Sequence, residues 1–373
     1  MLTQRATEIT REMVRLKSVT FQEEAAARYL ERFFLQAGFS VEVDEVNNVV
    51  AELKGSGGGK RVFFLGHHDT VEEGDPKLWT YPPFEAAVAQ GRIWGRGTAD
   101  EKGGLAACMA AVEKLLAEDR NIRGDILIVS SREETSDLST RGIVKLLDRG
   151  IEADFCIVVE PTCLEIMLGH KGRAVIDIET HGKTAHSSVP EMGINAINHM
   201  ARLLLELEAM PLPDRPPLGR GTQSAGVIAG GVRPNIVPER CSVSIDRRIV
   251  GGESAASVEA EIRAVIDRLA AKTPGFKATF SIRPPYLPSY IDKDAYVVRA
   301  LSDVLREIDA PVRVGFMDGH TDGEWIVNDL GIPAVILGPG DMRQAHATDE
   351  YVEIEQLGRA AEIYYRLLRK ELY

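Results

Sequence analysis

The segment VFFLGHHDTV, residues 62–71, places four apolar residues directly before a glycine and a cluster of polar side chains. A short apolar run that ends at a glycine is typical of a buried strand in a parallel sheet. Further strands are expected at 125–130, 154–159 and 334–337, and stretches with helical spacing lie between them. Strands that alternate with helices predict an α/β fold, in which a mostly parallel sheet is flanked by helices.

The pattern changes after about residue 170. Strands and helices now come in pairs, and a long helix is expected at 254–270. This arrangement predicts a smaller α+β domain inserted into the first one. We therefore expect a catalytic domain in two segments, residues 1–171 and 285–373, interrupted by an inserted domain at 172–284.

Composition argues against several classes of protein. The chain has 373 residues and a formal net charge of −12, which disfavours nucleic acids and anionic membranes as partners. No stretch approaches the roughly 20 apolar residues of a membrane span, and the first residues lack the apolar core of a signal peptide. The cysteines show no paired spacing and are expected to be buried thiols: Cys108, Cys156, Cys163 and Cys241. A cytoplasmic location is the resulting expectation.

Side chains that commonly bind metals follow the expected strands at their carboxyl ends. They are His67, the pair Glu133 and Glu134, Glu160 and His346, and Asp100 lies in the glycine-rich loop WGRGTAD, residues 94–100. In an open parallel sheet, ligands bind at this edge, because the loops there converge on one crevice. We therefore expect these side chains to form one site.

Imidazole and carboxylate groups without a cysteine cluster favour Zn²⁺ or a similar first-row divalent ion. Two histidines and three carboxylates are more than one tetrahedral catalytic ion needs. Two ions that share one bridging carboxylate would use all five ligands and leave room for a shared hydroxide. The sequence therefore predicts a centre with two divalent metal ions.

Spacing within the motifs separates the roles of neighbouring residues. On an extended backbone, Glu133 and Glu134 point to opposite sides, so one is expected to be a ligand and the other a general base. Asp69 lies two residues after His67, on the same side of an extended chain, and is expected to orient its imidazole. This geometry favours His67 over His68 as the ligand.

Several motifs together resemble one known family. They are GHHDTV (66–71), GRGTADEKGG (95–104), EE (133–134), VVEPT (158–162), HGKTAH (181–186), GGVRPNIVP (230–238), the segment Asp246–Arg248 and HATDEYV (346–352). The chain is similar to the dinuclear zinc hydrolases that include acetylornithine deacetylase, succinyl-diaminopimelate desuccinylase, aminoacylase and glutamate carboxypeptidase. The motifs span nearly the whole chain in the order that this family has.

The resemblance implies a role for each matched residue of the catalytic domain. His67, Asp100 and Glu160 would hold one metal ion, and Asp100, Glu134 and His346 the other, with Asp100 bridging. Glu133 would take a proton from the bridging water and pass it to the leaving nitrogen. The ions would be Zn²⁺, with Co²⁺ or Mn²⁺ as alternatives.

The resemblance also implies that the inserted domain is a lid and a dimerisation surface. His186 would reach the active site of a neighbouring subunit in a homodimer and stabilise the oxyanion. Asn235 and Arg248 would bind the carboxylate of a small-molecule substrate, a role that suits the planar fork of a guanidinium. Arg233 and Arg247, in contrast, are expected to be surface charges.

Some positions depart from the family pattern. Arg132 precedes the glutamate pair where relatives commonly carry an acid, and His68 stands between His67 and Asp69. His320 and Asp322 lie in a segment that often differs between specificities of the family, and no role is derived for them.

The leading hypothesis is a metal-dependent amidohydrolase that cleaves the amide bond of an N-acyl amino acid. A dipeptidase or carboxypeptidase of the same mechanism and a carbamoylase are alternatives within the enzyme class. A catalytically silent metal-binding relative is the alternative outside it. A nucleotide-binding oxidoreductase is disfavoured, because GHHDTV stands where a glycine-rich fingerprint would follow the first strand.

Overall fold

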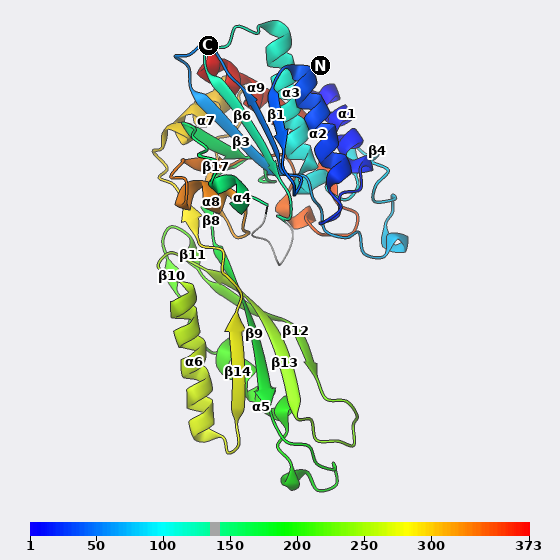
Figure 1. Cartoon of the computed structure of the whole chain (residues 1–373), viewed down its shortest axis with the longest axis vertical. Coiled ribbons are helices and arrows are strands. Elements are labelled where there is room, and N and C mark those ends of the chain that lie inside the picture. The colour runs from blue at the N-terminus through cyan, green and yellow to red at the C-terminus, as the bar shows by residue number, and fades with distance from the viewer. Residues whose placement is uncertain (135–141) are drawn as a thin grey trace. The chain divides into compact units, whose positions relative to one another are not determined.

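The computed structural model describes residues 1–134 and 142–373, which form two compact units (Figure 1). The first unit comprises Met1–Gly169, Tyr290–Met317 and Thr321–Tyr373. The second comprises His170–Ser289 and Asp318–His320. The main part of the second unit, His170–Ser289, is therefore inserted between two segments of the first.

A nine-stranded sheet forms the centre of the first unit. Its order is β1-β2-β6-β3-β7-β17-β8-β15, and β16 pairs with β8. The strands are β1 (Ser40–Val43), β2 (Val49–Leu53), β3 (Arg61–His67), β6 (Asp125–Ser131), β7 (Phe155–Val158), β8 (Ile166–His170), β15 (Ser289–Tyr290), β16 (Val314–Met317) and β17 (Ala334–Ile336). The central strands β6, β3, β7 and β17 are parallel, whereas β2 and β8 pair antiparallel to their neighbours. The predicted α/β class with a mostly parallel sheet is confirmed.

Helices cover both faces of this sheet, as the sequence of β3 requires. Val62 and Phe64 belong to one apolar core with α1 (Leu2–Arg15), α3 (Gly103–Glu118), α7 (Tyr296–Glu307) and α9 (Ile354–Leu372). Phe63 and Leu65 belong to a second core with α4 (Val144–Leu147) and α8 (Gly323–Asn328). Because successive side chains of a strand point to opposite faces, an unbroken apolar run can only be buried between two layers of helices.

The remaining elements of the first unit lie outside the main sheet. They are α2 (Glu24–Ala37), the π-helical turn η2 (Thr98–Lys102), the 3-10 turns η1 (Pro76–Leu78) and η4 (Met342–Gln344), and a small sheet of β4 (Ala87–Ala89), β5 (Arg92–Trp94) and β18 (Tyr351–Glu353). The small sheet joins two distant parts of the chain, since Tyr351 of β18 pairs with Trp94 of β5.

The second unit is an antiparallel sheet with two helices packed on one face. The sheet order is β12-β13-β9-β14, with β9 (Gly172–His181), β12 (Thr222–Gly230), β13 (Arg240–Ile249) and β14 (Lys277–Ile282). The helices are α5 (Ala196–Glu208) and α6 (Ala255–Lys272), and short elements are η3 (Pro190–Met192), β10 (Asp214–Arg215) and β11 (Gly219–Arg220). Alternate residues of β9 and β13 are buried against the helices, so the other face of the sheet is polar.

Two expectations about single residues are wrong. Arg247 is buried and pairs with Glu253, whose Oε1 atom lies 2.6 Å from its Nη2 atom, so it is no surface charge. Cys163 is exposed, whereas Cys108, Cys156 and Cys241 are buried free thiols as expected. Arg247 is buried because it follows Asp246 on the strand and points to the helix-covered face.

Within residues 1–134 and 142–373, no helix has both the length and the apolar character to cross a membrane.

Candidate metal centre

The parallel register of the sheet brings the ends of three strands together. His67 is the last residue of β3 and lies opposite Ser131 of β6, while Leu65 lies opposite Val158 of β7. Glu133 and Glu134 therefore follow β6, and Glu160 follows β7, beside His67. This placement is a direct consequence of parallel strands that end at the same edge.

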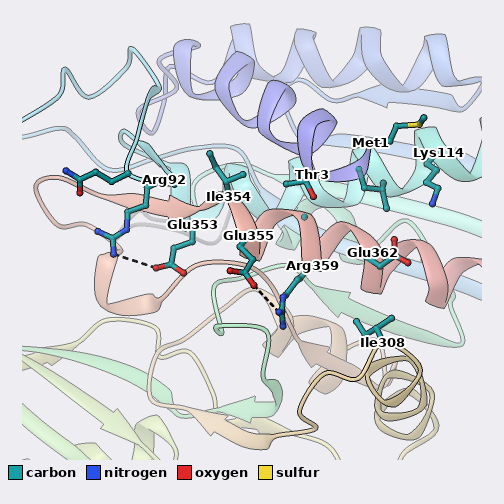
Figure 2. Close-up of a pocket in the computed structure, with 14 residues that line it drawn as sticks. Met1, Thr3, Arg92, Lys114, Ile308, Glu353, Ile354, Glu355, Arg359 and Glu362 are labelled. Carbon is teal, nitrogen blue, oxygen red and sulfur yellow. Dashed lines mark ion pairs between the residues drawn. The ribbon is translucent and has the colours of Figure 1, made fainter.

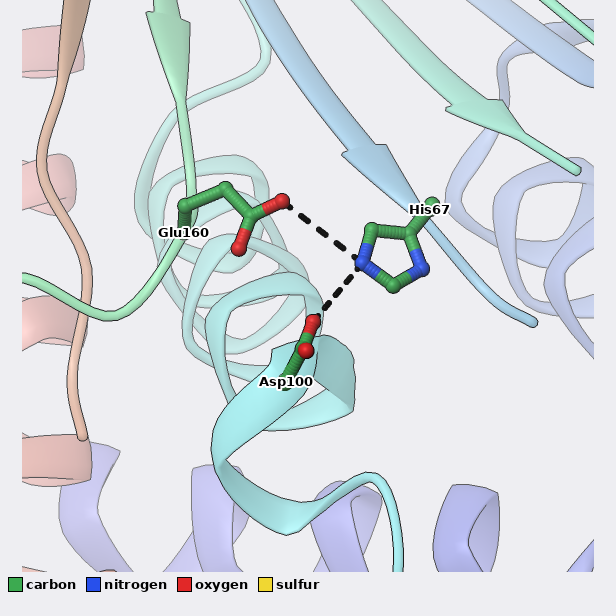
Figure 3. Close-up of side chains that lie close together, drawn as sticks. All are labelled: His67, Asp100 and Glu160. Atoms are coloured by element: carbon green, nitrogen blue, oxygen red, sulfur yellow. Dashed lines mark hydrogen bonds and ion pairs between the residues drawn. The ribbon is translucent and has the colours of Figure 1, made fainter. Parts of the chain in front are cut away.

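Three of the predicted ligands form a compact group (Figure 3). The Nε2 atom of His67 lies 2.9 Å from Oδ1 of Asp100 and 3.6 Å from Oε1 of Glu160. One ligand atom from each residue lies within 4.8 Å of the other two. All three residues are buried, so the donor atoms are held in a protein environment rather than in bulk water.

The remaining two predicted ligands lie at the edges of this group. Nε2 of His346 is 3.2 Å from Oδ2 of Asp100, the oxygen that His67 does not contact. Oε2 of Glu134 is 3.9 Å from Nε2 of His67. The two oxygens of Asp100 therefore face two different histidines, which is the arrangement that a bridging carboxylate needs.

Electrostatics of the cluster favour a bound cation. Burial raises the pKa of Glu134 and Glu160 well above the ordinary range of a glutamate, and the neighbouring carboxylates raise the pKa of each further. Burial would also raise the pKa of Asp100, but hydrogen bonds with His346 and His67 hold it below its usual range. Crowded, buried carboxylates repel one another, and a divalent ion would remove this repulsion. The donor set of imidazole and carboxylate suits such an ion.

Asp69 lies where it can orient the imidazole of His67. Nδ1 of His67 is 3.1 Å from the backbone carbonyl oxygen of Asp69 and 3.3 Å from its Oδ1 atom. The carboxylate of Asp69 is itself held, because it accepts hydrogen bonds from the Thr20 hydroxyl at 3.0 Å and from the backbone N–H of Glu134 at 3.2 Å. With Nδ1 engaged, Nε2 is the atom that faces Asp100 and Glu160.

His68 lies away from this cluster. Its Nδ1 atom is 2.8 Å from the hydroxyl of Ser130, and burial lowers its pKa to about 3. His68 is therefore a neutral, buried side chain.

The expected extended backbone at the glutamate pair is wrong. Glu133 has a φ of 61°, in the left-handed region, so the two side chains do not diverge through strand alternation. They still point to different partners: Glu134 approaches His67, while the carboxylate of Glu133 contacts the guanidinium of Arg132. Arg132, which departs from the family pattern, thus contacts the carboxylate of the expected general base.

Two acids that the sequence analysis left without a role lie next to the cluster. The carboxylate of Glu101 accepts a hydrogen bond from the backbone N–H of His67. Asp322 accepts a hydrogen bond from the hydroxyl of Ser131 at 2.6 Å, and burial raises the pKa of Asp322 to about 6. Their residue type was visible in the sequence, but their proximity depends on the π-helical turn and on the loop before α8.

The other predicted site residues belong to the second unit. His186 and Asn235 lie on adjacent segments, because His186 forms a backbone bridge with Ile236 and the N–H of Ser187 donates to the carbonyl oxygen of Asn235. Arg248 lies near the end of β13, and its Nε atom donates to Oδ1 of Asp246 at 2.8 Å.

A cavity of about 1050 Å³ lies at a different place in the first unit (Figure 2). It is lined mainly by residues of α1, the β4–β5 turn and α9, and the ion pairs Arg92–Glu353 and Arg359–Glu355 lie at its wall. None of the described residues that line this cavity is a predicted site residue, so the cavity is separate from the metal cluster.

Residues 63–370 match the sequence profile of peptidase family M20/M25/M40. The chain belongs to this family. The match includes all five residues of the predicted M20 metal centre and the whole inserted unit. As an M20 member with deacylase relatives, the chain is a hydrolase of amide or peptide bonds.

Individual relatives agree with this assignment. The chain is 31% identical to succinyl-diaminopimelate desuccinylase from Paracoccus denitrificans, with 97% of each chain covered. It is 29% identical to acetylornithine deacetylase from Aliivibrio fischeri, over 90% of this chain and 88% of that one. Among solved structures, a tripeptidase from Staphylococcus aureus matches with a TM-score of 0.82 and 25% identity, over 98% of this chain and 99% of that one.

Proposed function

We propose that the chain is a dinuclear metal-dependent amidohydrolase that removes the acyl group from an N-acyl amino acid. The observation that carries this proposal is the position of Asp100, whose two carboxylate oxygens face His67 and His346 separately. The names of the desuccinylase and deacetylase relatives support an acyl group on an amino-acid nitrogen as the substrate class.

Five side chains of the first unit would hold the metal ions. His67, Asp100 and Glu160 would bind one ion, and Asp100, Glu134 and His346 the other. When bound, such a pair of ions polarises the scissile carbonyl and makes a water molecule acidic enough to react near neutral pH. Zn²⁺ fits the nitrogen and oxygen donors, and Co²⁺ or Mn²⁺ are alternatives for the same set.

Glu133 is the proposed general base. Its carboxylate would accept a proton from the attacking water and deliver it to the nitrogen of the leaving amine. Glu133 is buried beside the cluster, and the guanidinium of Arg132 contacts its carboxylate. Arg132 would therefore keep this side chain in place before the reaction.

Arg248 and Asn235 are proposed to bind the free carboxylate of the substrate. Arg248 shares the carboxylate of Asp246 with Arg173, whose Nε atom donates to Oδ2 at 2.6 Å. The planar fork of a guanidinium can donate two parallel hydrogen bonds to a carboxylate, which suits Arg248 to an anionic group of a substrate. His186 is proposed to donate a hydrogen bond to the developing oxyanion.

We further propose that the chain acts as a homodimer through its inserted unit. His186 lies beside Ile236, before β13 begins at Arg240, whereas Arg248 lies near its other end. At roughly 3.3 Å per residue, this stretch of β13 is about 26 Å long, so one small substrate cannot contact both side chains of one chain. Two chains could supply them, with His186 and Asn235 from one chain and Arg248 from the other.

The outer strand of the inserted unit supports this assembly. β12 is an edge strand, and its side chains Val227 and Ile228 are 64% and 57% exposed. An edge strand with exposed apolar side chains is a surface that another strand can pair with.

The proposed enzyme has no nucleic-acid or membrane partner and is cytoplasmic.

A dipeptidase or carboxypeptidase is the second candidate, because the tripeptidase from Staphylococcus aureus shares the fold at a TM-score of 0.82. The same residues would cleave a peptide bond. A carbamoylase of the same mechanism remains a further alternative.

A substrate panel tests the proposal. N-acetyl and N-succinyl amino acids, dipeptides and N-carbamoyl amino acids would be incubated with the Zn²⁺-loaded protein, and the released acid, amine and ammonia measured. We expect release of the acyl acid, with a loss of about 10²–10⁴-fold in kcat for Glu133→Gln at unchanged metal content. Glu24→Gln, which removes an exposed carboxylate, is the control. Undiminished hydrolysis by Glu133→Gln would show that the assigned mechanism is wrong.

A further inference from the structure

Two residues in different motifs form a buried ion pair next to the metal cluster. Nη1 of Arg96 donates to Oε2 of Glu350 at 2.7 Å, and the two side chains are only 4% and 1% exposed. Arg96 follows β5, and Glu350 directly precedes β18. The pair thus joins parts of the chain that are 254 residues apart in sequence.

Glu350 also holds the backbone at Asp100. Its Oε1 atom accepts hydrogen bonds from the N–H of Ala99 at 2.9 Å and from the N–H of Asp100 at 3.2 Å. One carboxylate oxygen therefore fixes the backbone of the residue whose side chain faces both histidines, and the other oxygen is held by Arg96.

Arg96 in turn contacts the backbone at His346. Its Nη2 atom donates to the carbonyl oxygen of His346 at 3.4 Å, and its guanidinium packs over the ring of Trp79 at 5.1 Å. The backbone N–H of Gly95 donates to the carbonyl oxygen of Glu350 at 2.9 Å, which links the same two segments again. Three hydrogen bonds in series, through Glu350 and Arg96, therefore connect the backbones of Asp100 and His346.

We propose that Arg96 and Glu350 are positioning residues that set the separation between Asp100 and His346 for metal binding. This inference rests on the proposed metal centre, and it assigns a role to two residues that would not touch metal or substrate. A buried ion pair is weak evidence for stability, because desolvation offsets much of the attraction. Metal binding, in contrast, requires donor atoms within about 0.5 Å of their productive positions.

The second unit contains a matched control. Arg247 and Glu253 form a buried pair at 2.6 Å, with side chains 1% and 5% exposed. The second carboxylate oxygen of Glu253 accepts a hydrogen bond from the backbone N–H of Val250 at 2.7 Å. Arg247 keeps Glu261 as a partner at 2.7 Å, so Glu253→Gln weakens a buried ion pair and a charged backbone hydrogen bond without a link to a predicted ligand.

The test measures metal affinity and stability separately. Protein stripped of metal with a chelator would be titrated with Zn²⁺ by calorimetry, and its unfolding temperature measured without metal. For Arg96→Lys and Glu350→Gln we expect the Kd for Zn²⁺ to rise about 10–100-fold, as when partners of metal ligands are removed. Glu253→Gln should lower the unfolding temperature but leave the Kd unchanged. Unchanged Kd values in Arg96→Lys and Glu350→Gln would overturn the proposal.

Hydrogen exchange of the metal-free protein provides a readout that does not depend on metal. In Arg96→Lys and in Glu350→Gln, peptides that contain Ala99–Asp100 and His346 should both exchange faster at a temperature where the fold is intact. The same peptides should be unaffected in Glu253→Gln. If the unsubstituted chain binds no Zn²⁺, the proposed function fails. In that case, faster exchange at Ala99–Asp100 without faster exchange at His346 would overturn the coupling itself.

Discussion

Nε2 of His346 lies 3.2 Å from Oδ2 of Asp100, although the two residues are far apart in the sequence. The other oxygen of Asp100 contacts His67 at 2.9 Å. A single carboxylate thus connects two imidazoles.

Asp100→Asn should abolish binding of both metal ions, whereas Glu134→Gln should abolish binding of one. The difference arises because both proposed ions share Asp100 but only one contacts Glu134. Metal content per chain after dialysis against Zn²⁺, measured by atomic emission, distinguishes the two variants. Equal metal content in Asp100→Asn and Glu134→Gln would contradict a bridging role.

Asp69→Asn should weaken Zn²⁺ binding about 10–100-fold, because the amide no longer provides a charged partner for Nδ1 of His67. Calorimetric titration of the metal-free protein measures this loss. Asp125→Asn is the control, since Asp125 accepts a backbone hydrogen bond at the far end of β6. A similar loss in both variants would mean that Asp69 acts only through stability.

The metal-free protein should become less stable as the pH rises from about 4 to 6. Burial raises the pKa of Asp322 from its ordinary 3.8 to about 6, so the native state retains a proton that the unfolded chain has already lost. A carboxyl group with a raised pKa stabilises the fold at low pH, and this stabilisation is lost as the pH passes through the raised value. For Asp322 the loss is on the order of 3 kcal/mol.

Chemical unfolding of the metal-free protein at several pH values tests whether its stability falls as the pH rises. The unsubstituted chain should lose stability over that range relative to Asp322→Asn, which cannot titrate at this position. A stability difference between the two proteins that does not change with pH would contradict the assignment.

Arg248→Gln should raise KM for an N-acyl amino acid about 10–100-fold and change kcat little, because the substrate carboxylate is bound equally in the ground state and the transition state. Steady-state kinetics over a range of substrate concentrations provide both constants. Arg268→Gln removes a partly exposed guanidinium of α6 and should leave both constants unchanged. A loss confined to kcat in Arg248→Gln would assign the residue a different role.

Ile228→Lys should dissociate the proposed dimer, since a charged side chain at the exposed edge of β12 disfavours strand pairing. Sedimentation velocity measures the change from dimer to monomer. Val88→Lys, on the exposed strand β4 of the first unit, is the control. If the unsubstituted chain sediments as a monomer, the homodimer proposal is wrong.

The sequence predicted the fold class because the pattern in each element is local. The unbroken apolar run Val62–Leu65 indicates a strand covered on both faces, and the structure buries alternate residues of β3 in two cores. The long helix expected at 254–270 is α6, Ala255–Lys272. Arg247 was misjudged because a charge on a strand is usually exposed, whereas here it has a buried glutamate partner.

The sequence by itself also determined which residue types are available for metal chemistry, since motif spacing places them after strands. Only the tertiary structure decided which atoms meet: the two oxygens of Asp100 face different histidines, Glu133 has a positive φ beside Arg132, and Glu350 joins Arg96 to the backbone at Asp100. These contacts depend on strand register and on loop conformations shared by residues far apart in the chain. Local periodicity carries no information about either, which is why the positions of Glu101 and Asp322 and the pairing of Glu350 with Arg96 emerged only from the folded chain.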